Sequence, residues 1–227
     1  MRAVSAVLWV SLVAAGFAQQ TAPSGQSVLL DNALLRVSRV DLPSSPLPLA
    51  AARSDIILIA LAPVAVTVDT AASIHSDAGD ARFVRAGNRL VVARDASGAS
   101  LIIVVLKKHW DAEVRYCELP ARCTRENGLG PSKISETTSL FTNGFITAMR
   151  HRVFANGSLE SSYYSQRGKD SILLLALTDM TADCAGIEQP LKQGQVYFTT
   201  AGSVNVDGGK TGAEWVVVRF NEPKGSQ

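Results

Sequence analysis

Residues 194–220 read GQVYFTTAGSVNVDGGKTGAEWVVVRF, and they repeat the pattern of residues 79–106, which read GDARFVRAGNRLVVARDASGASLIIVVL. Each copy opens on glycine, runs through a short β-type segment to Ala-Gly, and ends in a strongly apolar strand after a glycine-containing turn. Gly79 and Gly194 are 115 residues apart, and Gly87 and Gly202 keep the same offset. The constant offset predicts a duplicated unit of structure.

The strands that precede these stretches recur as well. Residues 144–154 match residues 33–43 at an offset of 111, and residues 171–177 match residues 56–62 at an offset of 115. Short strands at regular spacing with turn residues between them are typical of β-barrels and sandwiches. A repeat of this length indicates a duplicated domain, because solenoid repeats are much shorter.

The composition is that of a globular protein, with 47% hydrophobic and 19% charged residues. The 22 basic and 20 acidic residues leave a formal net charge of +2 and give no case for nucleic-acid binding. Residues 107–139 interrupt the strand pattern and are predicted to be a linker. The linker separates an N-terminal unit at 28–106 from a C-terminal unit at 140–221, and residues 222–227 form a tail.

The first 18 residues have the pattern of a secretory signal peptide. Arg2 precedes a short apolar run, and small residues lead to a predicted cleavage after Ala18. The run is shorter than the roughly 20 residues of a membrane-spanning helix. We therefore predict a secreted or periplasmic protein with a disordered lead at 19–27 and no membrane association after cleavage.

Three cysteines follow, at positions 117, 123 and 184. Export places them where disulfides persist. Cys117 and Cys123 are six residues apart in a loop, so a local bridge is one assignment and leaves Cys184 free. A bridge from either cysteine to Cys184 is the competing assignment, and the sequence does not choose between them.

The Gly-to-Ala-Gly turns at 79–87 and 194–202, each followed by an apolar closing strand, resemble those of the cupin family. The resemblance covers roughly residues 28–106 and 140–221. It implies an all-β fold with two tandem double-stranded β-helix barrels of the jelly-roll type, as in bicupins. Homodimers that form through barrel edges are common in this family, so the resemblance also leaves a homodimer open.

Metal-binding cupins carry two histidines and a glutamate on an early strand pair and a third histidine after the glycine turn. The matching positions here hold Ala50, Ala52 and Leu90 in the first copy, and Ser165, Arg167 and Asn205 in the second. Alanine and leucine have no ligand atom, and arginine is cationic. We therefore predict no metal site and no other cofactor.

The remaining candidate site residues lie mostly in the second copy. His151 is predicted on a strand face with Met149 and Val153, where it would act as a general base together with Glu160 and Arg167. A lone histidine on such a face is more often a hydrogen-bonded structural residue.

Arg39 and Arg150 match each other in the two opening strands. They would bind an anionic small molecule in each barrel, unless they point outward as ordinary surface residues.

Two functions follow. The first is a non-catalytic module that binds a small ligand or serves a structural role, and we favour it because the candidate groups are scattered. The alternative is a small-molecule or sugar-modifying enzyme (an isomerase, oxygenase or lyase) with an unconventional site in the C-terminal barrel.

Overall fold

The computed structural model describes residues 25–49, 53–95, 98–108, 113–117, 123–127, 133–162, 164–165, 168–200 and 202–221. The predicted signal peptide, Arg167 and the tail lie outside these residues. Every element in the described part of the chain is a β-strand. None of the described residues forms a helix that is long and apolar enough to cross a membrane.

The N-terminal half, residues 26–106, consists of two antiparallel sheets. The five-stranded sheet has the order β1 (Gln26–Asp31), β2 (Leu35–Asp41), β9 (Ser100–Leu106), β4 (Ile56–Ala60), β7 (Ala81–Val84). The four-stranded sheet has the order β3 (Leu47–Leu49), β8 (Leu90–Arg94), β5 (Val64–Val68), β6 (Ile74–Ser76). An apolar core separates the two sheets, and Val66, Val92 and Leu101 are among its members.

The C-terminal half, residues 114–220, repeats this arrangement. Its larger sheet has the order β10 (Val114–Tyr116), β12 (Ser135–Asn143), β13 (Ile146–Val153), β22 (Ala213–Phe220), β17 (Ser171–Ala176), β20 (Val196–Thr199), and β11 (Thr124–Asn127) also pairs with β12. Its four-stranded sheet has the order β14 (Ser158–Ser162), β21 (Ser203–Asp207), β18 (Met180–Cys184), β19 (Glu188–Leu191). A short hairpin joins β15 (Tyr164–Ser165) to β16 (Gly168–Lys169).

The two copies therefore have the same topology, because the order β1-β2-β9-β4-β7 corresponds to β12-β13-β22-β17-β20. The closing strands predicted from LIIVVL and WVVVRF are the central strands β9 and β22. Both are buried along almost their whole length. A continuous apolar run is expected there, since each of these strands has a core on both of its faces. The all-β prediction is confirmed.

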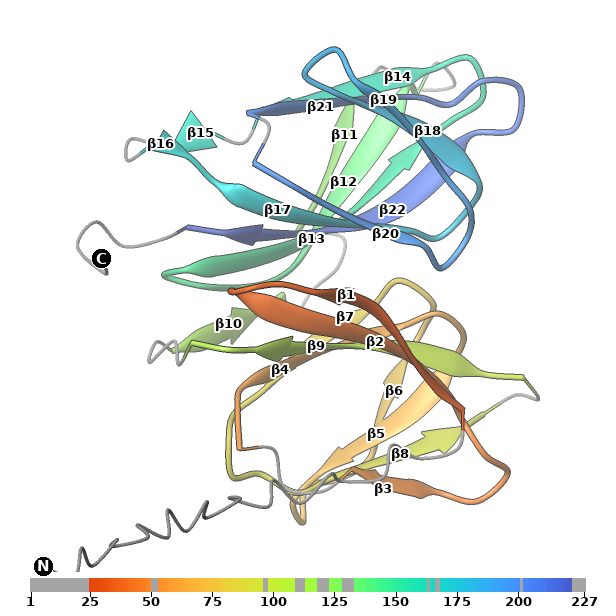
Figure 1. The fold of residues 1–227 in the computed structure, drawn as a ribbon. Coiled ribbons are helices and arrows are strands. Elements are labelled where there is room, and N and C mark those ends of the chain that lie inside the picture. Colours follow the sequence, from red (N-terminus) through yellow and green to blue (C-terminus); the bar gives the residue numbers. More distant parts are fainter. Residues whose placement is uncertain are drawn as a thin grey trace, which may run out of the picture.

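The two halves share a third apolar core. Its members come from the larger sheet of each half, and they include Val37, Ile57 and Phe83 on one side and Ala148 and Val218 on the other. Figure 1 shows the C-terminal half above the N-terminal half, with these sheets turned toward each other. Alternate residues of the central strands therefore face the core of their own half and the core at the junction.

The segment predicted as a linker contributes strands. β10, β11 and the beginning of β12 lie within residues 107–139 and extend the larger C-terminal sheet. These strands are short and only partly buried, so they show no apolar alternation in the sequence. At the other end, β1 begins at Gln26, within the predicted lead.

Candidate functional site

A cleft of about 360 Å³ lies where the two halves meet, and we call it the junction cleft. The N-terminal half contributes the β6–β7 turn and β7, and the C-terminal half contributes β10, β12 and β13. The lining residues are Asp77, Asp80, Ala81, Arg82, Tyr116, Cys117, Thr138, Ser139, Leu140 and Arg150. This volume falls within the range of small-molecule sites, roughly 300–1,000 Å³. The lining is mainly polar and charged.

Tyr116 lines the cleft and connects the two halves through hydrogen bonds. It belongs to β10 of the C-terminal half, and its hydroxyl donates to the carbonyl of Phe83 in β7 at 2.8 Å. The same oxygen accepts the backbone N–H of Phe83 at 3.2 Å. Burial raises the pKa of Tyr116, so the phenol stays protonated and remains a donor near neutral pH. The ring is thereby held in one position.

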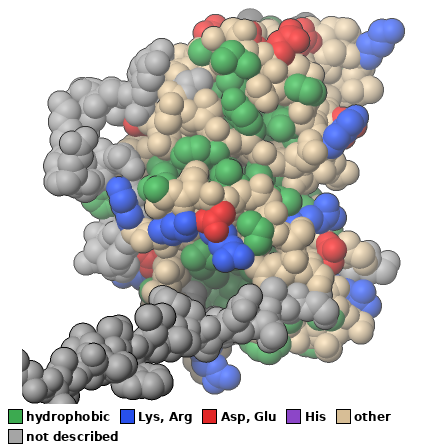
Figure 2. All heavy atoms as spheres, in the orientation of Figure 1, with side chains coloured by type: hydrophobic (Ala, Val, Ile, Leu, Met, Phe, Trp, Pro, Cys, Tyr) green, Lys and Arg blue, Asp and Glu red, His purple; other side chains and the backbone are tan. Residues whose placement is uncertain are grey.

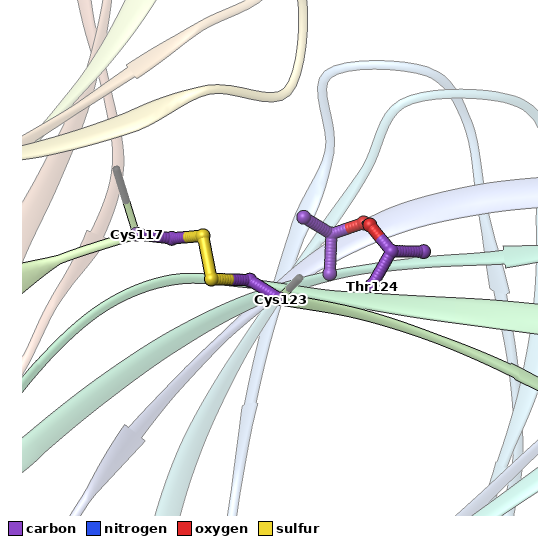
Figure 3. The surroundings of a disulfide bond; sticks show 4 residues. Cys117, Cys123 and Thr124 are labelled. Carbon is purple, nitrogen blue, oxygen red and sulfur yellow. A yellow bond between two sulfur atoms is a disulfide. The ribbon is translucent and has the colours of Figure 1, made fainter. Parts of the chain in front are cut away.

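A disulfide closes the loop directly after Tyr116. Cys117 and Cys123 are bonded, with their Cα atoms 6.2 Å apart. Figure 3 shows this bond, with Thr124 next to Cys123. The hydroxyl of Thr124 lies 2.8 Å from that of Thr138, a lining residue of the cleft. Of the three pairings that the sequence leaves open, the structure has the local one, and Cys184 is free and buried.

The carboxylates of the cleft are already paired. Asp77 lies 3.1 Å from Nε2 of His75, and Asp95 lies 2.7 Å from Nδ1 of the same ring. Hydrogen bonds to these two carboxylates raise the pKa of His75. Asp80 accepts the backbone N–H of Asp77 at 2.9 Å and lies 3.9 Å from Nη1 of Arg150. These contacts neutralise much of the negative charge in the lining.

The two arginines of the cleft differ in their partners. Arg150 donates to the carbonyl of Ala78 at 3.1 Å, and its Nε lies 3.6 Å from Glu214. Arg82 donates through Nε to the hydroxyl of Ser76 at 3.3 Å, and its guanidinium carbon lies 5.7 Å from the centre of the Tyr116 ring. Within the described residues Arg82 has no carboxylate partner. It is the least neutralised charge of the cleft.

Both predicted strand arginines lie at the junction and not inside their own halves. Arg150 shares its strand face with Ile146 and Ala148, which belong to the shared core. Arg39 donates to the hydroxyl of Ser100 at 3.3 Å and pairs with Asp41 at 3.3 Å. The structure therefore places the two guanidinium groups between the halves, and only Arg150 lines the junction cleft.

His151 lies inside the C-terminal half, on the same strand face as Met149 and Val153. Its Nδ1 is 2.9 Å from the hydroxyl of Thr137, and its ring stacks on Trp215 with 5.2 Å between centroids. Burial lowers its pKa to about 4, so the imidazole is neutral at pH 7. Its Nε2 has no partner among the described residues.

Glu160, the other described member of the predicted catalytic group, does not join His151. Glu160 is exposed on β14, whereas its neighbour Leu159 packs against the core of this half. Adjacent residues of a strand face opposite sides, so the carboxylate points away from the imidazole. Arg167 lies outside the described residues. The two members that the structure describes, Glu160 and His151, are therefore not brought together.

The residues at the cupin ligand positions do not fit a metal. Leu90 is buried in the N-terminal core, and Asn205 is exposed on β21. Ala50 and Ala52 lie outside the described residues. Across the described ranges, no group of three or more His, Cys, Asp and Glu side chains is placed to hold a metal ion.

The sequence predicts Arg150 as a site residue but misses Arg82 and Tyr116. Tyr116 lies in the segment predicted as a linker, so its contact with Phe83 has no counterpart in the repeat. One signal was present around Gly79, where the first copy has Asp80 and Arg82. The second copy has Gln195 and Tyr197 at these positions. Because only the first copy has charged residues at these two positions, the repeated fold does not require Asp80 and Arg82.

The face of the molecule in Figure 2 is neither strongly basic nor strongly acidic. Basic and acidic side chains are scattered there, and a small group of basic side chains surrounds an acidic one near the level at which the halves meet. A broad basic face, which nucleic-acid binding normally uses, is not visible in this view.

No family model and no curated protein sequence matches the chain. Solved structures do match. A cupin 2 conserved barrel domain protein from Leptotrichia buccalis has a TM-score of 0.50 at 9% identity, and the match covers 86% of this chain and 88% of that one. Procruciferin, an 11S globulin from Brassica napus, has a TM-score of 0.57 at 10% identity, with coverage of 82% and 77%.

Streptomyces albus HEPD, solved with its substrate 2-hydroxyethylphosphonate and Fe(II) bound, has a TM-score of 0.59 at 9% identity, with coverage of 85% and 69%. At these identities the likeness concerns the fold alone, and the same fold occurs in a globulin and in a substrate-bound iron protein. The repeated sheet order and these likenesses lead to one conclusion: the protein has the cupin fold.

Proposed function

We propose that the protein is an exported, non-catalytic cupin-fold protein that binds a small polar molecule in the junction cleft. The observation that carries this proposal is the cleft itself, whose walls come from both halves and whose charged groups converge on one space. Sites between packed units are a common place for small ligands.

The walls of the cleft are held before any ligand arrives. The rings of Phe83 and Phe141 meet edge to face at a centroid distance of 6.0 Å, and Tyr116 lies 6.0 Å from Phe141. These contacts tie β7 of one half to β10 and β12 of the other. A preformed site loses less conformational entropy on binding than a mobile one. This rigidity supports a binding role.

The charged groups of the cleft support binding more than catalysis. A general base must reach the proton that it removes, and it works best with a pKa near the operating pH. Asp77, Asp80 and Arg150 each lie within ion-pair distance of a partner, so none of them is free to take up a substrate proton. His151, the histidine predicted as a base, lies in the core of the C-terminal half and outside the cleft.

Export remains part of the proposal and rests on the signal-peptide pattern of Met1 to Ala18. Expression of the full chain in a secreting host, followed by N-terminal sequencing of the exported protein, tests it. We expect the mature chain to begin at Gln19. A product that keeps Arg2 and stays inside the cell would contradict export.

The binding role can be tested by NMR titration of the exported protein with a panel of small polar probes, namely galactose, galacturonate and galactose 6-phosphate. We expect shift changes concentrated at the cleft, in Ala81, Tyr116 and Ser139. The variant Ser139→Trp places a large ring in the cleft and should abolish these changes. The control variant Ser158→Trp, on an exposed strand of the C-terminal half, should leave them intact.

Two results would oppose the proposal. One is a panel that leaves every cleft residue unshifted, and the other is shift changes that persist in Ser139→Trp.

A further inference from the structure

The chemistry of the junction cleft indicates which class of ligand it takes. Arg82 belongs to β7 and lines the cleft, and its charge has no carboxylate partner among the described residues. The other charged lining residues have ion-pair contacts, Asp77 with His75 and Asp80 with Arg150. On the basis of the proposed function, we infer that the junction cleft binds a small molecule through an oxyanion group (carboxylate, phosphate or sulfate) held by Arg82.

The guanidinium group of Arg82 is oriented from two sides. Ser76 accepts a hydrogen bond from Nε at 3.3 Å, and the guanidinium carbon lies over the ring of Tyr116, 5.7 Å from its centroid. Arginine has five N–H donors in a fixed planar fork, so four remain after the bond to Ser76. A fork of this kind matches the two oxygens of a carboxylate or phosphate. Because Arg82 already has these two contacts, less side-chain entropy is lost when an anion binds.

The orienting contacts are themselves anchored. The hydroxyl of Tyr116 is bound to both backbone polar groups of Phe83, the residue after Arg82. The strand that carries Arg82 therefore also fixes the Tyr116 ring over which its guanidinium lies. Next to Tyr116, the bond between Cys117 and Cys123 closes the chain into a loop. Arg82 is thus held by a connected set of contacts that crosses between the halves.

Comparison of the two copies indicates that the fold does not require Arg82 and Tyr116. β20 of the C-terminal half corresponds to β7, and it forms the same edge of its sheet with Tyr197 in place of Arg82 and Gln195 in place of Asp80. Among the described residues, the N-terminal five-stranded sheet has no strand that corresponds to β10 and its tyrosine. The fold therefore forms without this charge and this ring, so their presence in the first copy is explained better by a ligand.

The experiment uses three probes that share one ring: galacturonate with a carboxylate, galactose 6-phosphate with a phosphate, and neutral galactose. Affinities for the exported, disulfide-bonded chain are measured by NMR titration of the cleft residues. We expect at least one of the two anions to bind about tenfold or more tightly than galactose. That preference should shrink as salt is raised, because the site is open to solvent. The probe that binds more tightly distinguishes carboxylate from phosphate chemistry.

Two variants of Arg82 and one control variant test whether Arg82 causes the preference for anions. Arg82→Gln removes the charge and should reduce anion affinity by about tenfold or more while leaving galactose within twofold. Arg82→Lys keeps the charge without the fork and should retain part of the affinity. Arg115→Gln removes an exposed arginine next to Tyr116 that does not line the cleft, and it should change nothing. Unchanged thermal midpoints confirm that each variant is folded.

The outcomes separate this inference from the proposed function. If all three probes bind in the cleft with similar affinity, and Arg82→Gln affects them equally or not at all, the oxyanion inference is overturned and the binding role stands. If no probe shifts the cleft residues at tens of millimolar, both are overturned. Selective loss of anion binding in Arg82→Gln supports both.

Discussion

The side chain of Arg150 lies directly across Gly79, so that a Cβ atom on Gly79 would be 2.7 Å from Cδ of Arg150. The reverse contact exists as well, since a Cβ atom on Gly194 would be 3.2 Å from Nη1 of Arg39. Gly79 and Gly194 are the glycines that open the repeated stretch, and Arg39 and Arg150 match each other in the opening strands. Each half thus rests its arginine on the glycine turn of the other.

This contact predicts that Gly79→Ala destabilises the protein more than Gly87→Ala. Both glycines have a positive φ, 85° and 89°, but a Cβ atom on Gly87 would meet nothing within 4 Å. Gly87→Ala should therefore show the backbone cost alone, about 1 kcal/mol. Gly79→Ala should add the overlap with Arg150 and Leu177, for a total of about 3 kcal/mol in the free energy of unfolding. Urea unfolding measures both. Equal losses would show that the halves do not meet closely at this turn.

His151 predicts a specific pH dependence of stability. Its folded pKa is lowered from 6.5 to about 4, so between these values the unfolded chain binds a proton that the folded chain does not. The contribution is therefore fully present above pH 6.5 and is lost as the pH falls toward 4. The size of this loss should be roughly 3 kcal/mol.

The measurement compares urea unfolding of the wild type with His151→Leu from pH 7 to pH 4. The variant should lose less stability over this range, by roughly the amount assigned to His151. His75→Gln serves as the control, because its ring is exposed and its folded pKa is raised instead. Identical slopes for wild type and His151→Leu would mean that the imidazole is not buried in neutral form.

The cysteines predict the outcome of thiol titration. Cys117 and Cys123 are bonded, and Cys184 is buried in the core of the C-terminal half, where burial raises its pKa. A thiolate-specific reagent should therefore detect no thiol in the native exported protein. It should detect one thiol after unfolding in urea and three after reduction. A reactive thiol in the native state would contradict either the pairing or the burial of Cys184.

The repeat predicts the architecture because each strand of the repeated unit is recognisable from its own short stretch of sequence. LIIVVL and WVVVRF are buried on both faces, so they read as unbroken apolar runs, and they become the central strands of the two larger sheets. The aspartates at matching positions before β4 and β17, Asp55 and Asp170, are both buried. These strands and aspartates depend only on contacts within their own copy, so they recur in the other copy and can be recognised as a repeat in the sequence.

The candidate site could be predicted only in part, because it depends on contacts between the copies. Arg150 was predicted as an anion ligand, but its approach to Asp80 across the junction follows from how two sheets pack and not from any spacing. Tyr116 lies in a three-residue strand without apolar alternation. Its role is visible only when β10 is seen next to β7. Nothing in the sequence distinguishes Arg82 from the other basic residues, of which the chain has 22 in all, because its contacts appear only in the folded structure.

The central claim is that the junction cleft holds a small ligand, and crystal structures of the exported protein soaked separately in galacturonate and in galactose 6-phosphate test it most directly. For at least one of the two we expect density for the sugar between the β6–β7 turn and Ser139, with its carboxylate or phosphate on the guanidinium group of Arg82 and the ring near Tyr116. Density within the core of the C-terminal half beside His151, with the cleft free of sugar, would contradict the account.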